Sequence, residues 1–321
     1  MIRLMKMILT RKWRTMLDMA EGYKYICDSD TGEQLAIDRE TGEVLKSVSL
    51  EVPEGTSYIT PQQKRENEQK KKEQMRKKLS RKATDDALGR FYFCGIYEEF
   101  NDLSPETLAK VIYLCTFLEY DGNRLMKTER TQMKKSDLSE VLKVSRPTAT
   151  QFLKYVSPKY ISCNEDGYLF CNKNIIFRGK VPKCRKGDSL QKLRINGIRT
   201  LYQSTDKRYH KYLGYMFSLL EYVNIEYNVL CYNPMEKDAD KIILMSISEF
   251  CKKINYDVKH ISDLKFIYSK IVIDVDGKKE RFCGFAYDGI KSNNAKICIN
   301  PRVLYCGDDY TKVEVLGLLC K

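Results

Sequence analysis

Histidine is almost absent from the chain, which has only His210 and His260 among its 321 residues. Because these two residues lie 50 positions apart, the sequence contains no His-x-His metal pair. It also lacks a Gly-x-x-x-x-Gly-Lys-Ser/Thr phosphate loop, and this absence argues against ATP-driven chemistry.

Cysteine is present twelve times, but no two cysteines form a Cys-x-x-Cys pair. This scatter favours buried thiols in a reducing, cytoplasmic compartment over a disulfide framework. Cys163 and Cys171 flank a predicted loop, and we expect them to face each other across a hairpin. Cross-strand packing is favoured there over a zinc site, while a redox switch stays open as an alternative. The sequence predicts no metal and no cofactor.

Long apolar runs are also missing, so we expect no segment that spans a membrane. Residues 1–20 contain Met, Leu and Ile, but Arg3, Lys6 and Arg11 interrupt them, and no small-residue cleavage site follows. This segment is predicted to be amphipathic or frayed, with membrane association as the lesser alternative.

Basic residues are abundant and unevenly placed. The net charge is +13 and the pI is about 9.0, which points to a polyanionic partner, nucleic acid before anionic membrane. Between Lys64 and Lys82 there are ten Lys or Arg and three Glu. We therefore interpret residues 61–88 as a basic linker or arm, either an exposed helix or disordered. If this segment has a binding function, we expect it to contact DNA phosphates. The simpler interpretation is that it is a solvated surface.

The most informative stretch runs from Met133 to Val156. Apolar residues at helical spacing stop at Ser145-Arg146-Pro147 and then resume, which predicts two short helices around a tight turn. Ser145 is suited to cap the second helix, and Pro147 is tolerated in its first turn. If the second helix buries Ala149, Phe152, Leu153 and Val156, its opposite face presents side chains suited to phosphates and base edges, namely Arg146, Thr148, Thr150, Gln151 and Lys154.

A predicted β-hairpin follows the second helix directly. Residues 160–163 and 168–171 read as strands, and an Asp-Gly-containing loop joins them. The order helix, helix, turn, helix, hairpin is that of a winged helix-turn-helix, in which the hairpin is the wing.

The same pattern returns later in the chain. Residues 245–254 align with 133–142 at an offset of 112, and Leu264 matches Phe152 at the same offset. A second hairpin is predicted over residues 271–282, with its turn at Asp276-Gly277, and residues 297–307 are expected to close the unit as residues 175–179 close the first. We interpret this as an internal duplication of about 110 residues.

The predicted fold class is α+β, with two tandem winged helix-turn-helix domains. We divide the chain into an N-terminal segment (1–20), a small β-meander (21–60), the basic linker (61–88), winged helix 1 (89–182), and a connecting helix with winged helix 2 (183–321). Within the last part, helices are expected over residues 189–200 and 207–223.

The duplicated pattern resembles the tandem winged-helix DNA-binding proteins of plasmids, phages and integrative elements of Gram-positive bacteria, including their replication initiators. The resemblance spans Leu103 to Gly307 and rests on the paired helix-turn-helix segments, the wings and the closing strands. It implies recognition of double-stranded DNA, often at repeated sites, and sometimes dimerisation. It also makes host replication or transcription machinery an expected partner.

We expect the protein to bind specific DNA sequences of a mobile element as a replication initiator-like protein, with a transcription regulator as the alternative. In the second unit, base or phosphate contacts are predicted from Lys259, His260, Ser262 and Lys265, and wing contacts from Lys278, Lys279 and Arg281. A third reading, a DNA-processing enzyme, has little support. Asp274 and Asp276 resemble a two-metal carboxylate pair, but an Asp-Gly turn explains them better. We therefore predict no catalytic residues.

Overall fold

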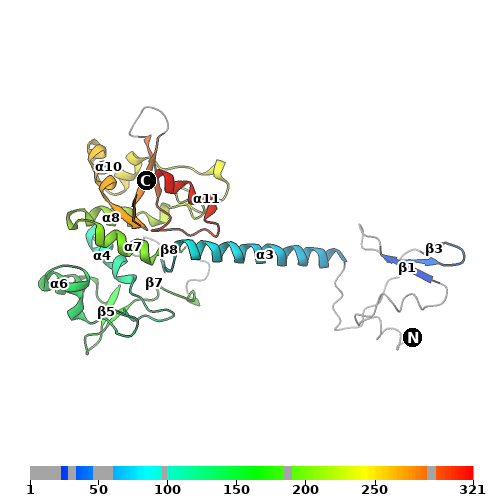
Figure 1. Ribbon diagram of the computed structural model, residues 1–321, viewed down its shortest axis with the longest axis horizontal. Coiled ribbons are helices and arrows are strands. Elements are labelled where there is room, and N and C mark those ends of the chain that lie inside the picture. The colour runs from blue at the N-terminus through cyan, green and yellow to red at the C-terminus, as the bar shows by residue number, and fades with distance from the viewer. Residues whose placement is uncertain are drawn as a thin grey trace. The chain divides into compact units, whose positions relative to one another are not determined.

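The computed structural model (Figure 1) has a mixed α+β fold with several small sheets. The chain forms two compact units, residues 1–78 and 79–321. The predicted N-terminal segment 1–20 lies outside the described part of the chain. The structure describes residues 23–27, 34–45, 61–95, 100, 102–183, 190–275, 277–287 and 294–320.

The predicted meander is confirmed in the first unit. Strands β1 (Tyr23–Cys27), β2 (Gln34–Asp38) and β3 (Val44–Leu45) form an antiparallel sheet in the order β1-β2-β3. Between β2 and β3, Asp38 Oδ1 accepts hydrogen bonds from the amides of Glu40 (2.8 Å) and Thr41 (3.1 Å). Gly42 has a φ of +72°, a conformation that glycine adopts without strain.

The basic segment is a helix, α3 (Pro61–Leu88). Its side chains from residue 63 to 78 are exposed, which accounts for their polar composition. From residue 79 onward the helix belongs to the second unit. There, Ser80 Oγ donates to the carbonyl of Asp308 (2.8 Å), and the carboxylate of Asp85 pairs with the fully buried guanidinium of Arg194 at 2.9 Å.

The first half of the second unit follows the predicted order. Ser104 caps its first helix by accepting a hydrogen bond from the Thr107 amide (3.3 Å). Its elements are β4 (Phe91–Cys94), α4 (Pro105–Cys115), the 3-10 turn η3 (Lys135–Asp137), α5 (Leu138–Val141), α6 (Arg146–Val156), β5 (Ile161–Cys163), β6 (Leu169–Cys171) and β7 (Ile176–Phe177).

The second half departs from the predicted helices at its start. The helix expected over residues 189–200 is wrong, because residues 191–194 pair as a strand and the helix begins only at Ile195. The helix expected over 207–223 is broken into three pieces. The elements are β8 (Gln191–Arg194), α7 (Ile195–Ser204), η5 (Lys207–Tyr209), α8 (His210–Phe217), η6 (Leu220–Tyr222), η7 (Ala239–Lys241), α9 (Ile247–Lys253), η8 (Val258–His260), α10 (Ile261–Lys270), β9 (Val272–Val275), β10 (Lys278–Arg281), β11 (Cys283–Ala286), β12 (Lys296–Ile299), α11 (Thr311–Glu314) and α12 (Leu316–Leu319).

The backbone repeats between the two halves as the sequence predicts. The amide of Met133 donates to the carbonyl of Leu125 (2.7 Å), and the amide of Met245 donates to that of Leu230 (2.9 Å). Lys143 and Asn255, which lie two residues after the ends of α5 and α9, have positive φ values of 53° and 55°. The buried faces of the following helices also match at an offset of 112, since Ala149, Phe152 and Val156 correspond to Ile261, Leu264 and Tyr268.

The hairpin that corresponds to β5–β6 is β11–β12, which corrects the predicted assignment of residues 271–282. Leu125 donates its amide to Leu169 in β6 (3.1 Å), and Leu230 donates its amide to Ile297 in β12 (3.0 Å). The β9–β10 hairpin, with Gly277 at a φ of +78°, stands between α10 and β11 as an insertion. The Asp-Gly signal for its turn is strong and local. The long-range backbone hydrogen bonds that match those of β5–β6 are made by β11–β12.

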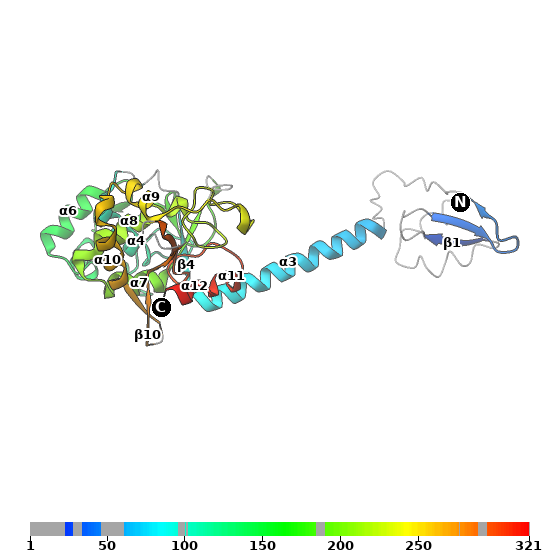
Figure 2. The ribbon, with the colours of Figure 1, turned by 90° about the horizontal axis from the view of Figure 1, so that it is seen from above.

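The two halves share one sheet and one core. β4 pairs antiparallel with β7 on one edge and with β8 on the other, and an isolated bridge from Leu193 to Leu304 continues the sheet. Helices α4 and α8 pack against each other, and the rings of Tyr113 and Tyr202 stack at 4.0 Å. Figures 1 and 2 show α4, α7 and α8 grouped together, and Figure 1 places them between α6 and α10.

The prediction that Cys163 and Cys171 face each other across the first hairpin is wrong. Cys163 faces Leu169 in the ladder and Cys171 faces Ile161, so the two thiols are out of register. Cys171 Sγ instead lies 3.7 Å from Cys115 Sγ inside the core. Burial raises the pKa of the Cys115 thiol, which keeps it protonated and is consistent with packing.

Gly214 provides a test of the packing of α8 on α4. A Cβ at this position would lie 1.7 Å from the carbonyl oxygen of Pro105. Helix propensity alone would make Gly214→Ala stabilising by about 1 kcal/mol. A collision with fixed backbone outweighs this gain, and we expect the free energy of unfolding to fall by about 2 kcal/mol or more. Urea unfolding measures this change in the free energy of unfolding. Lys211→Ala, at an exposed position of α8, should change stability by less than about 0.5 kcal/mol.

Candidate nucleic-acid interface

Helix α6 presents all five side chains predicted for the first half. Ser145 accepts a hydrogen bond from the Thr148 amide (3.4 Å), and Pro147 stands in the first turn, as expected. The buried residues lie on one side of the helix, although Leu153 is only partly buried. The other side exposes the predicted set, Arg146, Thr148, Thr150, Gln151 and Lys154.

The C-terminal end of α6 is held by Asp102. The backbone carbonyl of Asp102 accepts a hydrogen bond from the Tyr155 hydroxyl at 2.5 Å, and its carboxylate pairs with Lys159 at 2.9 Å and also accepts from the Tyr160 hydroxyl. Burial, together with the neighbouring Asp102, raises the pKa of Tyr160 to about 12, so this hydroxyl keeps its proton. Both ends of α6 are thus fixed by side-chain hydrogen bonds.

The exposed face of α6 is electropositive. The helix contains no Asp or Glu, and in the described part of the chain neither Arg146 nor Lys154 pairs with a carboxylate. The nearby Lys127 differs, because Asp137 (3.0 Å) and Glu140 (2.8 Å) neutralise it. The tip of the β5–β6 hairpin is acidic, since Glu165 and Asp166 are exposed there.

Helix α10 is the counterpart of α6 but has a different exposed face. At an offset of 112, the positions of Gln151 and Lys154 are taken by Asp263 and by Phe266, which is 59% exposed. Of the predicted residues, only His260 and Ser262 occupy positions equivalent to Thr148 and Thr150. Asp263 also binds His260 Nδ1 at 3.0 Å.

The other predicted residues of the second half are dispersed. Lys259 lies at the position of Pro147, and Lys265, at the position of the partly buried Leu153, places its ammonium 4.8 Å from the centre of the Tyr287 ring. Lys278, Lys279 and Arg281 are exposed on β10. They therefore lie on a different element from the α10 residues.

Asp274 behaves as a turn residue. Its Oδ1 accepts a hydrogen bond from the Gly277 amide at 2.9 Å, as an Asp-Gly turn requires. Asp276 lies outside the described residues. Within the ranges that the structure describes, no group of three or more His, Cys, Asp or Glu is placed to hold a metal ion.

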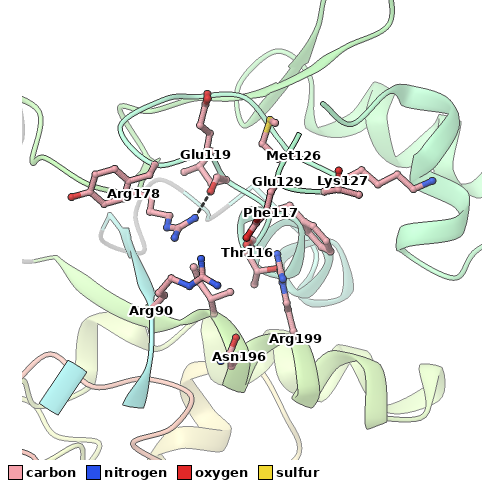
Figure 3. Close-up of a pocket in the computed structure, with 14 residues that line it drawn as sticks. Arg90, Thr116, Phe117, Glu119, Met126, Lys127, Glu129, Arg178, Asn196 and Arg199 are labelled. Atoms are coloured by element: carbon pink, nitrogen blue, oxygen red, sulfur yellow. Dashed lines mark hydrogen bonds between the residues drawn. The ribbon is translucent and has the colours of Figure 1, made fainter. Parts of the chain in front are cut away.

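Sequence reasoning missed a cavity of about 550 Å³ at the junction of the two halves. Figure 3 shows the guanidiniums of Arg90, Arg178 and Arg199 converging in it, while Lys127 points away. Arg178 Nη1 donates to the Leu118 carbonyl (3.0 Å), and Arg199 donates to the Thr116 hydroxyl (3.0 Å) and carbonyl (2.8 Å). No local signal marks these arginines, because they come from three distant segments.

His210 is a core residue and not a ligand. Its Nε2 lies 3.2 Å from the Tyr202 carbonyl oxygen and 3.1 Å from that of Thr205, and its ring packs on Tyr202 at 4.2 Å. Burial lowers the pKa of His210 below its ordinary value of 6.5, although the two carbonyls oppose this shift.

Comparison of the chain with protein families, with curated proteins and with solved structures finds no match. Among the described residues, no helix has the length and apolar character needed to cross a membrane.

The lowered pKa of His210 predicts how stability depends on pH. Because the unfolded chain takes up a proton on this histidine more readily than the folded chain, stability should fall as the pH drops from about 7.5 to about 5.5. Gln does not titrate, so His210→Gln should flatten this slope in urea unfolding measured across the range. Gln151→Ala, at an exposed position that carries no titratable group, should keep the wild-type slope. Equal slopes in the wild type and His210→Gln would contradict the prediction.

Proposed function

We propose that the protein binds specific sequences in double-stranded DNA, with α6 of the first half as its main reading element. The observation that carries this proposal is the exposed face of α6. It holds Arg146, Gln151 and Lys154 without carboxylate partners among the described residues, on a helix fixed at both ends. A rigid helix with free donors matches the major groove, which admits one α-helix.

The element order of the first half supports a winged-helix interpretation. The elements α4, the short extended run at residues 124–126, α5, α6 and the β5–β6 hairpin follow one another as the winged helix-turn-helix requires. The second half repeats their backbone contacts. This is the arrangement by which the chain resembles replication initiators of mobile elements, so we propose that role. Regulation of transcription at an operator is the alternative for the same interface.

Each residue of the α6 face has a proposed task. Arg146, in the first turn, is placed to form two hydrogen bonds with a guanine, and Gln151 can do the same with an adenine. Thr148, Thr150 and Lys154 would contact phosphates or base edges. The acidic tip of the β5–β6 hairpin, with Glu165 and Asp166, would face away from the phosphates because like charges repel.

The second half has a lesser proposed role in reading sequence. Asp263 would be repelled by phosphates, and Phe266 cannot form hydrogen bonds with base edges. Lys278, Lys279 and Arg281 on β10 are exposed cations, and we propose that they bind the DNA backbone without reading bases. In this proposal only supporting contacts with DNA come from the remaining predicted residues, Lys259, His260, Ser262 and Lys265.

The α6 assignment is tested by selecting duplexes from a random pool and measuring affinity for the selected site. Arg146→Ala and Gln151→Ala should each weaken binding by roughly 1 to 3 kcal/mol and relax the sequence preference at one position. Both residues are exposed, so the unfolding midpoints should stay unchanged. Lys173→Ala, at an exposed loop position outside α6, is the control. Unchanged affinity in both α6 variants would remove α6 from the interface.

The basic part of α3 should contribute without regard to sequence. Lys70, Lys71 and Lys72 are exposed, and replacing all three by Ala should lower affinity for every duplex and reduce the slope of log affinity against log salt by up to about 3. Fluorescence anisotropy across a salt series measures both quantities. A loss confined to the selected site would contradict a phosphate role.

A further inference from the structure

The cavity between the two halves concentrates positive charge that the α6 interface does not use. Four cationic side chains and two carboxylates line it. One carboxylate, Glu119, is already engaged, because it binds the Arg124 guanidinium through Nε at 2.7 Å and through a second, shorter contact. The other, Glu129, is exposed and forms no ion pair with a described residue.

The three arginines keep most of their donors free. A guanidinium has five N–H donors. Arg178 uses one in its bond to Leu118, and Arg199 uses one from Nε and one from Nη2 in its bonds to Thr116. The Arg90 guanidinium has no hydrogen-bond or carboxylate partner in the part of the chain that the structure describes. The donors left over are arranged around one space (Figure 3).

The arginines of this group repel one another. Burial lowers the pKa of Arg178 and of Arg199, and the neighbouring arginines lower both further. The cations are nevertheless held together by the core, since Arg178 follows β7, Arg199 belongs to α7 and Arg90 precedes β4. An anion in the cavity would remove this repulsion and pair with the free donors.

The size and surroundings of the cavity indicate a small ligand. A volume of about 550 Å³ lies in the range of small-molecule sites. The first turn of α7, with Ile195 and Asn196 in the lining, adds the partial positive charge of a helix N-terminus. Tyr120, which is 67% exposed, offers an aromatic face at the rim, and the Arg178 guanidinium lies 5.9 Å from its centre.

We propose that this cavity binds a multiply charged phosphate compound through Arg90, Arg178 and Arg199. Guanidiniums are the preferred partners of phosphate because their planar forks match its oxygens. The cavity is concave, and Arg178 and Arg199 are partly buried in it, which favours a free phosphate compound over the convex backbone of a duplex. Since both halves supply arginines, binding would join them at their junction.

The test uses the full chain, with pyrophosphate and ATP as probes in isothermal titration calorimetry at low salt. Arg90→Glu changes an exposed side chain without a described partner, so the fold should be retained, as thermal unfolding will check. This variant should weaken binding of both probes by about tenfold or more. Lys207→Glu makes the same charge change at an exposed position outside the cavity and should have less than about a twofold effect.

A parallel titration with duplex DNA separates the two sources of phosphate. If Arg90→Glu weakens duplex binding but the wild type binds neither pyrophosphate nor ATP, the cavity does bind phosphate. The phosphate groups that it binds are then those of the DNA backbone. If neither the probes nor the duplex distinguish Arg90→Glu from Lys207→Glu, the proposal is overturned. Arg146→Ala should leave pyrophosphate binding unchanged, so this result is independent of the DNA-reading role of α6.

Discussion

The antiparallel pairing of β4 with β8 fixes the arrangement of everything in the second unit. These are the first strands of the two repeated halves, and their register, with Tyr92 opposite Leu193, sets one half against the other. β7 and the bridge at Leu304 extend the sheet on either side, so each half closes onto its own first strand. Helices α4 and α8 are then brought together, and Gly214 allows the backbone of α8 to approach Pro105.

The first helix-turn-helix segment and its hairpin were predictable because their signals are local. Ser145-Arg146-Pro147 specifies a cap and a helix start, the spacing of Ala149, Phe152 and Val156 specifies the buried face, and Gly167, with a φ of +83°, specifies the hairpin turn. Each signal acts within a few residues, so tertiary contacts had little to override. The repeat was visible for the same reason, since its core positions recur at a constant offset.

The remaining features depend on contacts between distant residues. Residues 191–194 have no sequence pattern that distinguishes them from the helix that follows. They form a strand because they pair with β4. The second hairpin was assigned by its Asp-Gly turn, whereas the bonds of Leu230 and Asn228 to β12 identify the true counterpart. The arginine cavity had no sequence signal, because Arg90, Arg178 and Arg199 meet only after both halves have folded.

The shared sheet also orders the assembly of the chain during synthesis. β4 is made early, but its first partner, β7, follows more than eighty residues later, and β8 comes after that. The far edge of β8 gains its neighbour only when Leu304, more than one hundred residues further along the chain, is available. Until then an unpaired strand edge is exposed to other chains. A chain that has not yet folded its segment around Leu304 therefore carries an unpaired strand edge in its central sheet, and that segment covers the edge.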